Sequence, residues 1–227
     1  MQPLLKICGL TREEDVALCC RLGVDICGFV TDYPIPVPWN LSMKQSAQLI
    51  RTVCRPSRSC VVTGGDAEQI CRLARELRPD FVQLHCNESL SDTEKIVRAL
   101  HPLGIGVIKT LPAAEAERLE QFGERTVEQC AEALYTAGAA AILVDSRTPS
   151  NAGSSGTAAD LQFYQKVRQS AQLPVILAGG ITPENCAEIL RAAAPEVIDI
   201  MTGVETAPGV KSAVKLLRLM KSLYGSC

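Results

Sequence analysis

Eight short apolar segments recur along the chain, and each interval between them is long enough to hold a helix. The segments are Leu4–Ile7, Ile26–Val30, Ser59–Val62, Phe81–Leu84, Gly106–Lys109, Ala141–Val144, Val175–Ala178 and Val197–Ile200. None alternates strictly between apolar and polar residues, which is typical of strands buried on both faces of a parallel sheet. Eight strand–helix units in 227 residues favour an α/β fold of the (β/α)8, or TIM-barrel, class, with residues 1–227 as a single domain.

The alternative arrangement is an open, doubly wound sheet. Such a sheet usually carries a Gly-x-Gly-x-x-Gly turn after its first strand, and Cys8-Gly9-Leu10 does not supply one. The two least regular stretches, residues 31–41 and 146–159, each follow a predicted strand. Because the loops after barrel strands form the catalytic face, we expect functional residues there.

Three pairs of residues are typical of the N-terminus of a helix. The pairs are Thr11 with Glu14, Ser91 with Glu94, and Thr182 with Pro183. The first two have capping-box spacing, and the third puts a cap residue before a proline at the first helical position. Each predicts a helix that begins directly after its cap.

The composition excludes several classes of function. The formal net charge is −2, so there is no basic excess that would bind nucleic acid. The longest apolar run, about residues 137–144, is far shorter than the ~20 residues that a membrane span needs. The first strand begins without a charged and then apolar leader, so we do not expect secretion.

The cysteine content predicts free thiols in a reducing compartment. The 11 cysteines are odd in number and include no Cys-x-x-Cys pair, and most fall in strand or helix patterns. The chain has only two histidines, His85 and His101, so a zinc site is not expected. We therefore expect a cytoplasmic protein without a metal or cofactor.

Cys8 is the first candidate for chemistry, because it lies where the first strand ends and a turn leads into a helix. Strand alternation places Lys6 and Cys8 on one face, and Asp199 on the eighth strand adjoins Lys6 once the barrel closes. The two charged residues could then form a buried ion pair. A nearby cation or helix N-terminus lowers the pKa of a thiol, and a thiolate can take a proton from carbon. Alternatively, Cys8 is an inert buried residue.

Asp145 is the second candidate, since it ends the apolar segment Ala141–Val144 on the other side of the chain's midpoint. A carboxyl group that burial keeps protonated can donate a proton. Alternatively, its oxygens cap the following loop, as aspartates often do. If both strands belong to one barrel, Cys8 and Asp145 face each other across its open end.

Two glycine clusters suggest a phosphate site. Gly179 and Gly180 close the seventh strand, and Thr202 and Gly203 follow the eighth. Loops at these two places form the recurrent phosphate site of barrels, because glycines let backbone amides approach the oxygens. Alternatively, the glycines only allow tight turns. The glycine- and serine-rich residues 153–157, which include Gly156, could add a third edge.

The motifs together resemble those of the phosphoribosylanthranilate isomerase family of tryptophan biosynthesis, nearly from end to end. They are Lys6-Ile7-Cys8-Gly9-Leu10-Thr11, Gly28-Phe29-Val30, Val82-Gln83-Leu84-His85, Val107-Ile108-Lys109, Leu143-Val144-Asp145-Ser146, Leu177-Ala178-Gly179-Gly180-Ile181-Thr182-Pro183-Glu184-Asn185 and Gly203-Val204-Glu205-Thr206-Ala207-Pro208-Gly209-Val210-Lys211. Several motifs in the right order are a much stronger signal than any one of them.

The resemblance implies a cofactor-independent Amadori rearrangement of a phosphoribosyl amine to a 1-amino-1-deoxyribulose phosphate. It implies that Asp145 is the general acid that opens the furanose ring and that Cys8 is the general base at C2. It also implies that the phosphate lies at Gly179-Gly180 and Thr202-Gly203. The implied partner is a small phosphorylated sugar amine, not a nucleic acid or a membrane.

The chain departs from the family pattern where the aromatic end of the substrate would bind. The family usually has Tyr-Pro-x-Ser-Pro-Arg after the second strand, with an arginine that meets the anthranilate. Here Trp39 stands about where that arginine should be, and an indole cannot form a bidentate pair with a carboxylate. Trp39 could stack on an aryl ring or anchor the loop. Arg147 could replace the arginine, and Gly153-Ser154-Ser155-Gly156 replaces the family's Gly-Gly-Thr-Gly loop.

Three hypotheses for function follow. The first is phosphoribosylanthranilate isomerase, and the second is a phosphosugar isomerase or lyase that accepts a different amine. The third is a non-catalytic barrel that binds a phosphorylated metabolite, although such a binder would not need both Cys8 and Asp145. The sequence leaves the oligomeric state open between a monomer and a homodimer.

Overall fold

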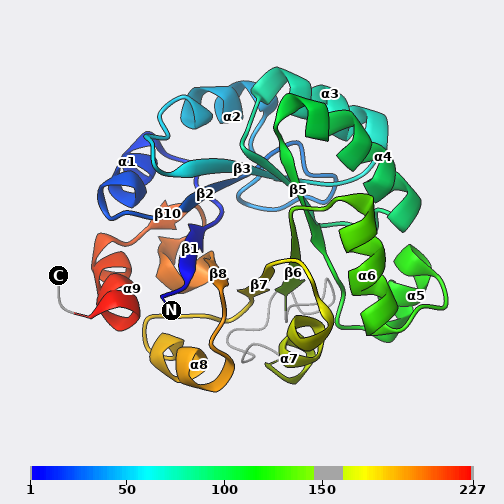
Figure 1. Cartoon of the computed structure of the whole chain (residues 1–227). Coiled ribbons are helices and arrows are strands. Elements are labelled where there is room, and N and C mark those ends of the chain that lie inside the picture. Colours follow the sequence, from blue (N-terminus) through cyan, green and yellow to red (C-terminus); the bar gives the residue numbers. More distant parts are fainter. Residues whose placement is uncertain (1, 146–160, 226–227) are drawn as a thin grey trace.

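Eight parallel strands form a closed barrel at the centre of the computed structural model, which describes residues 2–145 and 161–225. Each strand pairs with the next, and β8 pairs with β1 to close the ring, which helices surround (Figure 1). The strands are β1 Leu4–Ile7, β2 Ile26–Val30, β3 Arg58–Thr63, β4 Phe81–Leu84, β5 Gly106–Thr110, β6 Ala141–Asp145, β7 Val175–Ala178 and β8 Val197–Ile200. The predicted (β/α)8 barrel is therefore confirmed.

The helices follow the strands in the expected alternation. They are α1 Glu13–Arg21, α2 Met43–Ile50, α3 Ala67–Leu77, α4 Leu90–Leu100, α5 Glu115–Phe122, α6 Val127–Ala137, α7 Leu161–Ser170, α8 Cys186–Ala193 and α9 Ala213–Tyr224. Short 3-10 helices, η1 His101–Leu103 and η3 Thr202–Val204, and a small hairpin, β9 Glu205–Ala207 with β10 Val210–Lys211, complete the described elements. No helix in residues 2–145 and 161–225 has the length and apolar character needed to cross a membrane.

Strand alternation divides the buried side chains into two layers. The inward layer, which we call the interior cluster, consists of Cys8, Ile26, Val30, Cys60, Val62, Ile108, Ala141, Leu143, Ile176, Ala178 and Val197. Their strand neighbours, such as Leu5, Ile7 and Val144, point outward and pack with the helices. Burying one such aliphatic side chain contributes about 1.5–3 kcal/mol. Both faces are apolar, which explains why the strands show no polar alternation.

Two aspartates at the amino-terminal ends of the strands connect neighbouring strands. Asp25, just before β2, accepts a hydrogen bond from the Leu5 amide of β1 at 2.7 Å. Asp80, just before β4, accepts one from the Ser59 amide of β3 at 2.8 Å. These contacts stabilise the end of the barrel that lies opposite the candidate site.

The predicted helix starts are only partly correct. Thr11 does not cap α1, because its hydroxyl donates to the Gly209 carbonyl at 2.7 Å, and Arg12 is the cap residue. Helix α4 begins two residues early, since Ser89, not Ser91, accepts the amide of the third helical residue. The Thr182 hydroxyl does accept hydrogen bonds from backbone amides of the turn that follows it, as a cap residue would. The α-helix itself, however, begins only at Cys186.

Candidate active site at the carboxyl ends of the strands

Cys8 and Asp145 both lie at the carboxyl-terminal end of the barrel and on its inward face. Cys8 directly follows β1, and its side chain belongs to the interior cluster. Asp145 is the last residue of β6, in alternation with the inward residues Ala141 and Leu143. Cys8 is 5% exposed and the Asp145 side chain 8% exposed, so both are nearly enclosed at the barrel mouth.

The predicted ion pair beneath Cys8 is confirmed. Lys6 and Asp199 are register partners on β1 and β8, and their Nζ and Oδ2 atoms are 2.6 Å apart. Burial alone would lower the pKa of Lys6, but the adjacent Asp199 outweighs burial, so this pKa is raised. A permanent ammonium group therefore lies one inward position below the Cys8 thiol.

That ammonium does not make Cys8 a thiolate in the free protein. Burial raises the pKa of the Cys8 thiol, and the opposing effects of Lys6 and Lys211 do not cancel this rise. The Cys8 sulfur packs closely against Gly28 on β2. A glycine is needed there, because a Cβ would lie only 3.0 Å from the Cys8 Sγ. The free protein thus favours a thiol, contrary to the expected thiolate.

Trp39 anchors the loop that follows β2. Its indole nitrogen donates to the Glu205 carboxylate at 3.0 and 3.2 Å, while its ring packs against the interior cluster. Glu205 is itself buried and paired with Lys211 at 2.6 Å. The anchoring role proposed from the sequence is therefore present in the structure.

The opposite side of the same loop is held by Tyr33. Its hydroxyl donates to the His85 carbonyl after β4 at 2.8 Å. Asn40 joins the two sides, accepting from the Tyr33 amide and donating to the Tyr33 carbonyl, each at 2.9 Å. The loop thus extends across the mouth from the end of β4 to the hairpin after β8.

His85 is a site residue that the sequence analysis did not select. Its Nδ1 atom lies 3.1 Å from the Gln83 amide nitrogen and 2.9 Å from the Thr110 hydroxyl. Its Nε2 atom is 3.7 Å from Oδ2 of Asp145. A signal was available, because Gln83 and His85 are two apart and so share the inward face of β4.

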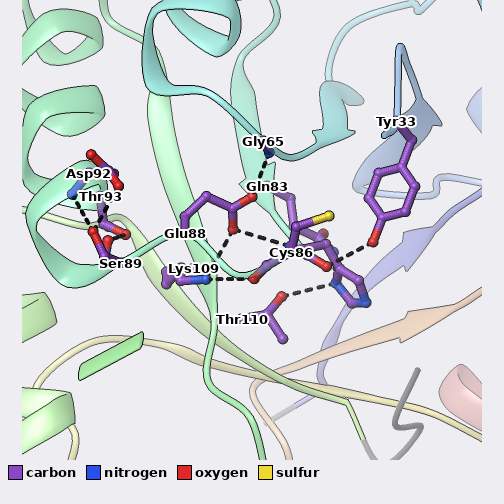
Figure 2. Close-up of polar contacts among 11 residues, drawn as sticks. Tyr33, Gly65, Gln83, Cys86, Glu88, Ser89, Asp92, Thr93, Lys109 and Thr110 are labelled. Atoms are coloured by element: carbon purple, nitrogen blue, oxygen red, sulfur yellow. Dashed lines mark hydrogen bonds and ion pairs between the residues drawn. The ribbon is translucent and has the colours of Figure 1, made fainter. Parts of the chain in front are cut away.

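A second buried ion pair lies on the outer side of β5. Lys109 Nζ is 3.1 Å from Glu88 Oε2, and both side chains are fully buried. The same carboxylate accepts from the Gly65 and Cys86 amides at 3.1 Å each (Figure 2). Glu88 thereby holds together the loops that follow β3 and β4.

The loops after β7 and β8 are in direct contact. Gly179 and Gly180 have φ values of 93° and 62°, a conformation that side chains disfavour. Gly203 in η3 is packed so closely that a Cβ there would be 2.0 Å from the Ile181 carbonyl oxygen. Thr202 opens η3 beside this contact. The candidate phosphate residues therefore form one continuous edge of the mouth.

Two of the predicted binding residues, Arg147 and Gly156, lie outside the described residues. Within residues 2–145 and 161–225, no group of three or more His, Cys, Asp or Glu is arranged to hold a metal ion. Surface grooves of about 370 and 610 Å³ lie on the outer helices, between α3 and α4 and between α4 and α6. Neither groove includes a residue of the mouth.

Comparison with known proteins gives a consistent result. A family model described as N-(5'phosphoribosyl)anthranilate (PRA) isomerase matches residues 5–222. The N-(5'-phosphoribosyl)anthranilate isomerase of Natronomonas pharaonis is 35% identical over 210 residues, which cover 92% of each chain. The crystal structure of the Thermus thermophilus enzyme is 31% identical, with a TM-score of 0.75 over 97% of this chain and 98% of that one. The Thermotoga maritima enzyme is 26% identical, with a TM-score of 0.79 over 99% and 100%.

Proposed function

Because this chain belongs to the N-(5'-phosphoribosyl)anthranilate isomerase family, we propose that its barrel mouth isomerises N-(5-phosphoribosyl)anthranilate. The product is 1-(2-carboxyphenylamino)-1-deoxyribulose 5-phosphate, and the reaction is a step of tryptophan biosynthesis. One observation supports this most strongly: a buried thiol and a carboxyl group lie on the inward faces of β1 and β6 at the same end of one barrel.

Asp145 acts first in this mechanism. The anilino nitrogen expels the ring oxygen, and the Asp145 carboxyl group gives that oxygen a proton as the C1–O bond breaks. The products of this step are an open-chain iminium and a carboxylate. The Asp145 side chain is only 8% exposed, so little water competes with the ring oxygen for this carboxyl group.

Cys8 acts second. The iminium makes the C2 proton acidic, and the Cys8 sulfur takes that proton to give an enol amine, which rearranges to the ketone. The thiol first releases its own proton to solvent, and the Lys6 ammonium stabilises the thiolate that results. General acid and base catalysis of this kind contributes about 10²–10⁴-fold for each group.

The phosphate would bind at the edge formed by Gly179, Gly180, Thr202 and Gly203. Positive φ values at the first two and the close contact of Gly203 with Ile181 turn backbone rather than side chains toward the mouth. Backbone amides of this kind bind phosphate oxygens. Gly156 stays a predicted third edge of this phosphate site, and Arg147 a predicted partner of the anthranilate carboxylate.

Trp39 favours a second candidate for the amine part of the substrate. The indole N–H is engaged by Glu205, so Trp39 offers a substrate only its ring face and edge. A flat aryl amine without a carboxylate would satisfy such a surface. The second candidate is therefore the same isomerisation on a different phosphoribosyl amine.

A turnover assay with N-(5-phosphoribosyl)anthranilate separates these functions, because substrate and product differ in fluorescence. We expect a fluorescence change at catalytic enzyme concentration, and a slower reaction with the aniline analogue that lacks the carboxylate. Faster reaction of the aniline analogue would establish the second candidate. Binding of the product without turnover of either amine would instead indicate a non-catalytic binding protein.

We also propose that the protein acts on this small molecule in the cytoplasm, as a monomer or a homodimer. All ten cysteines of the described segments are free thiols, as a reducing compartment favours.

A further inference from the structure

His85 lies beside Asp145 with an orientation that its neighbours fix. Gln83 and Thr110 contact its Nδ1 atom at 3.1 and 2.9 Å, and the Tyr33 hydroxyl holds its carbonyl at 2.8 Å. These contacts leave Nε2 facing Asp145, 3.7 Å from Oδ2. None of the catalytic steps described above uses this ring.

The contacts also determine which ring nitrogen carries the proton. Gln83 presents its side-chain amide nitrogen to Nδ1, and an amide nitrogen can only donate. With the amide nitrogen facing it, Nδ1 is the acceptor, and this orientation favours the neutral tautomer with its proton on Nε2, directed at Asp145. Gln83 is only 2% exposed, while the His85 side chain is 28% exposed, so the Gln83 end of this contact is the shielded one.

Burial, more than the charges around the ring, favours its neutral form. Desolvation lowers the pKa of His85, the opposing charges of Asp145 on β6 and Asp199 on β8 do not cancel this, and Lys6 on β1 and Lys109 on β5 lower it further. A charged imidazolium would favour the ionised form of the adjacent carboxyl group. A neutral N–H donor does not compel Asp145 to ionise, yet it can bind the carboxylate once that forms.

We propose that His85 is a positioning residue for Asp145. Its Nε2–H fixes the carboxyl group for donation to the ring oxygen and then donates to the carboxylate left behind. The inference rests on the proposed isomerase function. The distance of 3.7 Å is longer than a hydrogen bond, and catalytic contacts of this kind often shorten when the substrate binds.

The kinetic test compares His85→Ala, His85→Gln and His101→Ala. His85→Ala should lower kcat by about 10- to 100-fold with little change in KM, and should shift the limb of the kcat–pH profile that reports the acid. Glutamine can place an amide nitrogen near the Nε2 position, so His85→Gln should recover much of kcat. His101 lies in η1, away from the mouth, so His101→Ala controls for the loss of a histidine. A His85→Ala profile identical to the wild-type profile would overturn the proposal.

A second measurement does not depend on turnover. Nitrogen-15 NMR distinguishes the two neutral tautomers, and with two histidines in the chain the His101→Ala variant assigns both signals. We expect His85 to be neutral at pH 7 with its proton on Nε2. A proton on Nδ1, or a charged ring, would refute the positioning role even in an active enzyme. An inactive protein with the expected tautomer would refute the isomerase function and leave the ring geometry standing.

Discussion

Buried ion pairs determine the electrostatic surroundings of single residues at the barrel mouth. Lys6, Lys109 and Lys211 are each almost fully buried, and each lies within 3.1 Å of a carboxylate oxygen. Removing one partner of such a pair typically costs about 3–5 kcal/mol, because the other charge is left buried without a counter-charge. Of the three, Lys6 has a raised pKa and so supplies positive charge beneath Cys8, while Cys8 and Asp145 are the groups proposed to exchange protons.

Replacing either proposed catalytic group should abolish most of the activity. We expect Cys8→Ala and Asp145→Asn each to reduce kcat by about 10²-fold or more, since each removes one general acid or base. Product binding, measured by calorimetry, should change little. Cys60→Ala is the matched control, because it removes another buried thiol of the interior cluster. Wild-type kcat in either variant would exclude that residue from the mechanism.

The raised pKa of Cys8 predicts the direction of the pH dependence. The thiolate is the active form, and burial disfavours it, so kcat/KM should keep rising with pH beyond the ordinary thiol value of about 8.5. In the Cys8→Asp variant the base is a carboxylate, so the rise of kcat/KM should occur several pH units lower. A kcat/KM that is already flat from pH 6 upward in the wild type would contradict this expectation.

At the level of elements, the loop after β2 and the loops after β7 and β8 form different sides of the mouth. The first is held by side chains, with Tyr33 at one end and Trp39 at the other. The others are held by backbone contact, with Gly203 against Ile181. We expect the first side to determine which amine binds and the second to hold the phosphate.

The only tryptophan of the chain should report ligand binding at the first side. Product binding should change the emission of Trp39, because its ring packs at the mouth. Trp39→Phe should lose the indole hydrogen bond at a cost of about 1 kcal/mol, since Glu205 keeps Lys211 as a partner. We expect its KM to change more than its kcat. Emission that is unchanged at saturating product would show that the ligand does not reach this loop.

Gly203→Ala tests the second side. A methyl group cannot be placed 2.0 Å from the Ile181 carbonyl, so the two loops must separate. We expect KM for the phosphorylated substrate, and the inhibition constant of inorganic phosphate, to rise by about tenfold or more, with kcat less affected. Thermal unfolding measured in parallel would show whether the barrel remains intact. An unchanged phosphate affinity would place the phosphate elsewhere.

At the level of the whole molecule, chemistry and stability occupy opposite ends of the barrel. The candidate site lies at the carboxyl ends of the strands, while Asp25 and Asp80 connect strands at the amino ends. This division is general in such barrels. It allows the two properties to be changed separately.

Asp80 gives a test at the stabilising end. Burial opposes its ionised form, but hydrogen bonds from Ser59 and the Arg55 ion pair outweigh burial and lower the pKa of Asp80. Because its folded pKa lies below its unfolded value, its contribution to stability is present above about pH 4 and is lost on acidification. Asp80→Asn should therefore lower the free energy of unfolding at pH 7 but less at pH 3, with kcat unchanged. A change in kcat would argue against the separation of the two ends.

Most of this fold could be predicted, because a strand buried on both faces leaves a distinct apolar run in the sequence. All eight strands coincide with such runs. The ion pair between Lys6 and Asp199 could also be predicted, from strand alternation and barrel closure. Helix starts were less predictable, since the Thr11 hydroxyl is taken by Gly209, a residue distant in the chain. The roles of Trp39 and His85 likewise depend on partners from other loops. That residues 1–227 form a single domain remains a prediction.

The loop after β2 is fastened at Tyr33 and Trp39, is bridged by Asn40, and has prolines at positions 34, 36 and 38. We therefore expect that residues 34–38 can be exchanged as a cassette, with Val37 kept apolar because it packs against the interior cluster. Descendants of such a barrel could acquire new amine preferences by altering five positions, while the machinery for proton exchange is inherited intact.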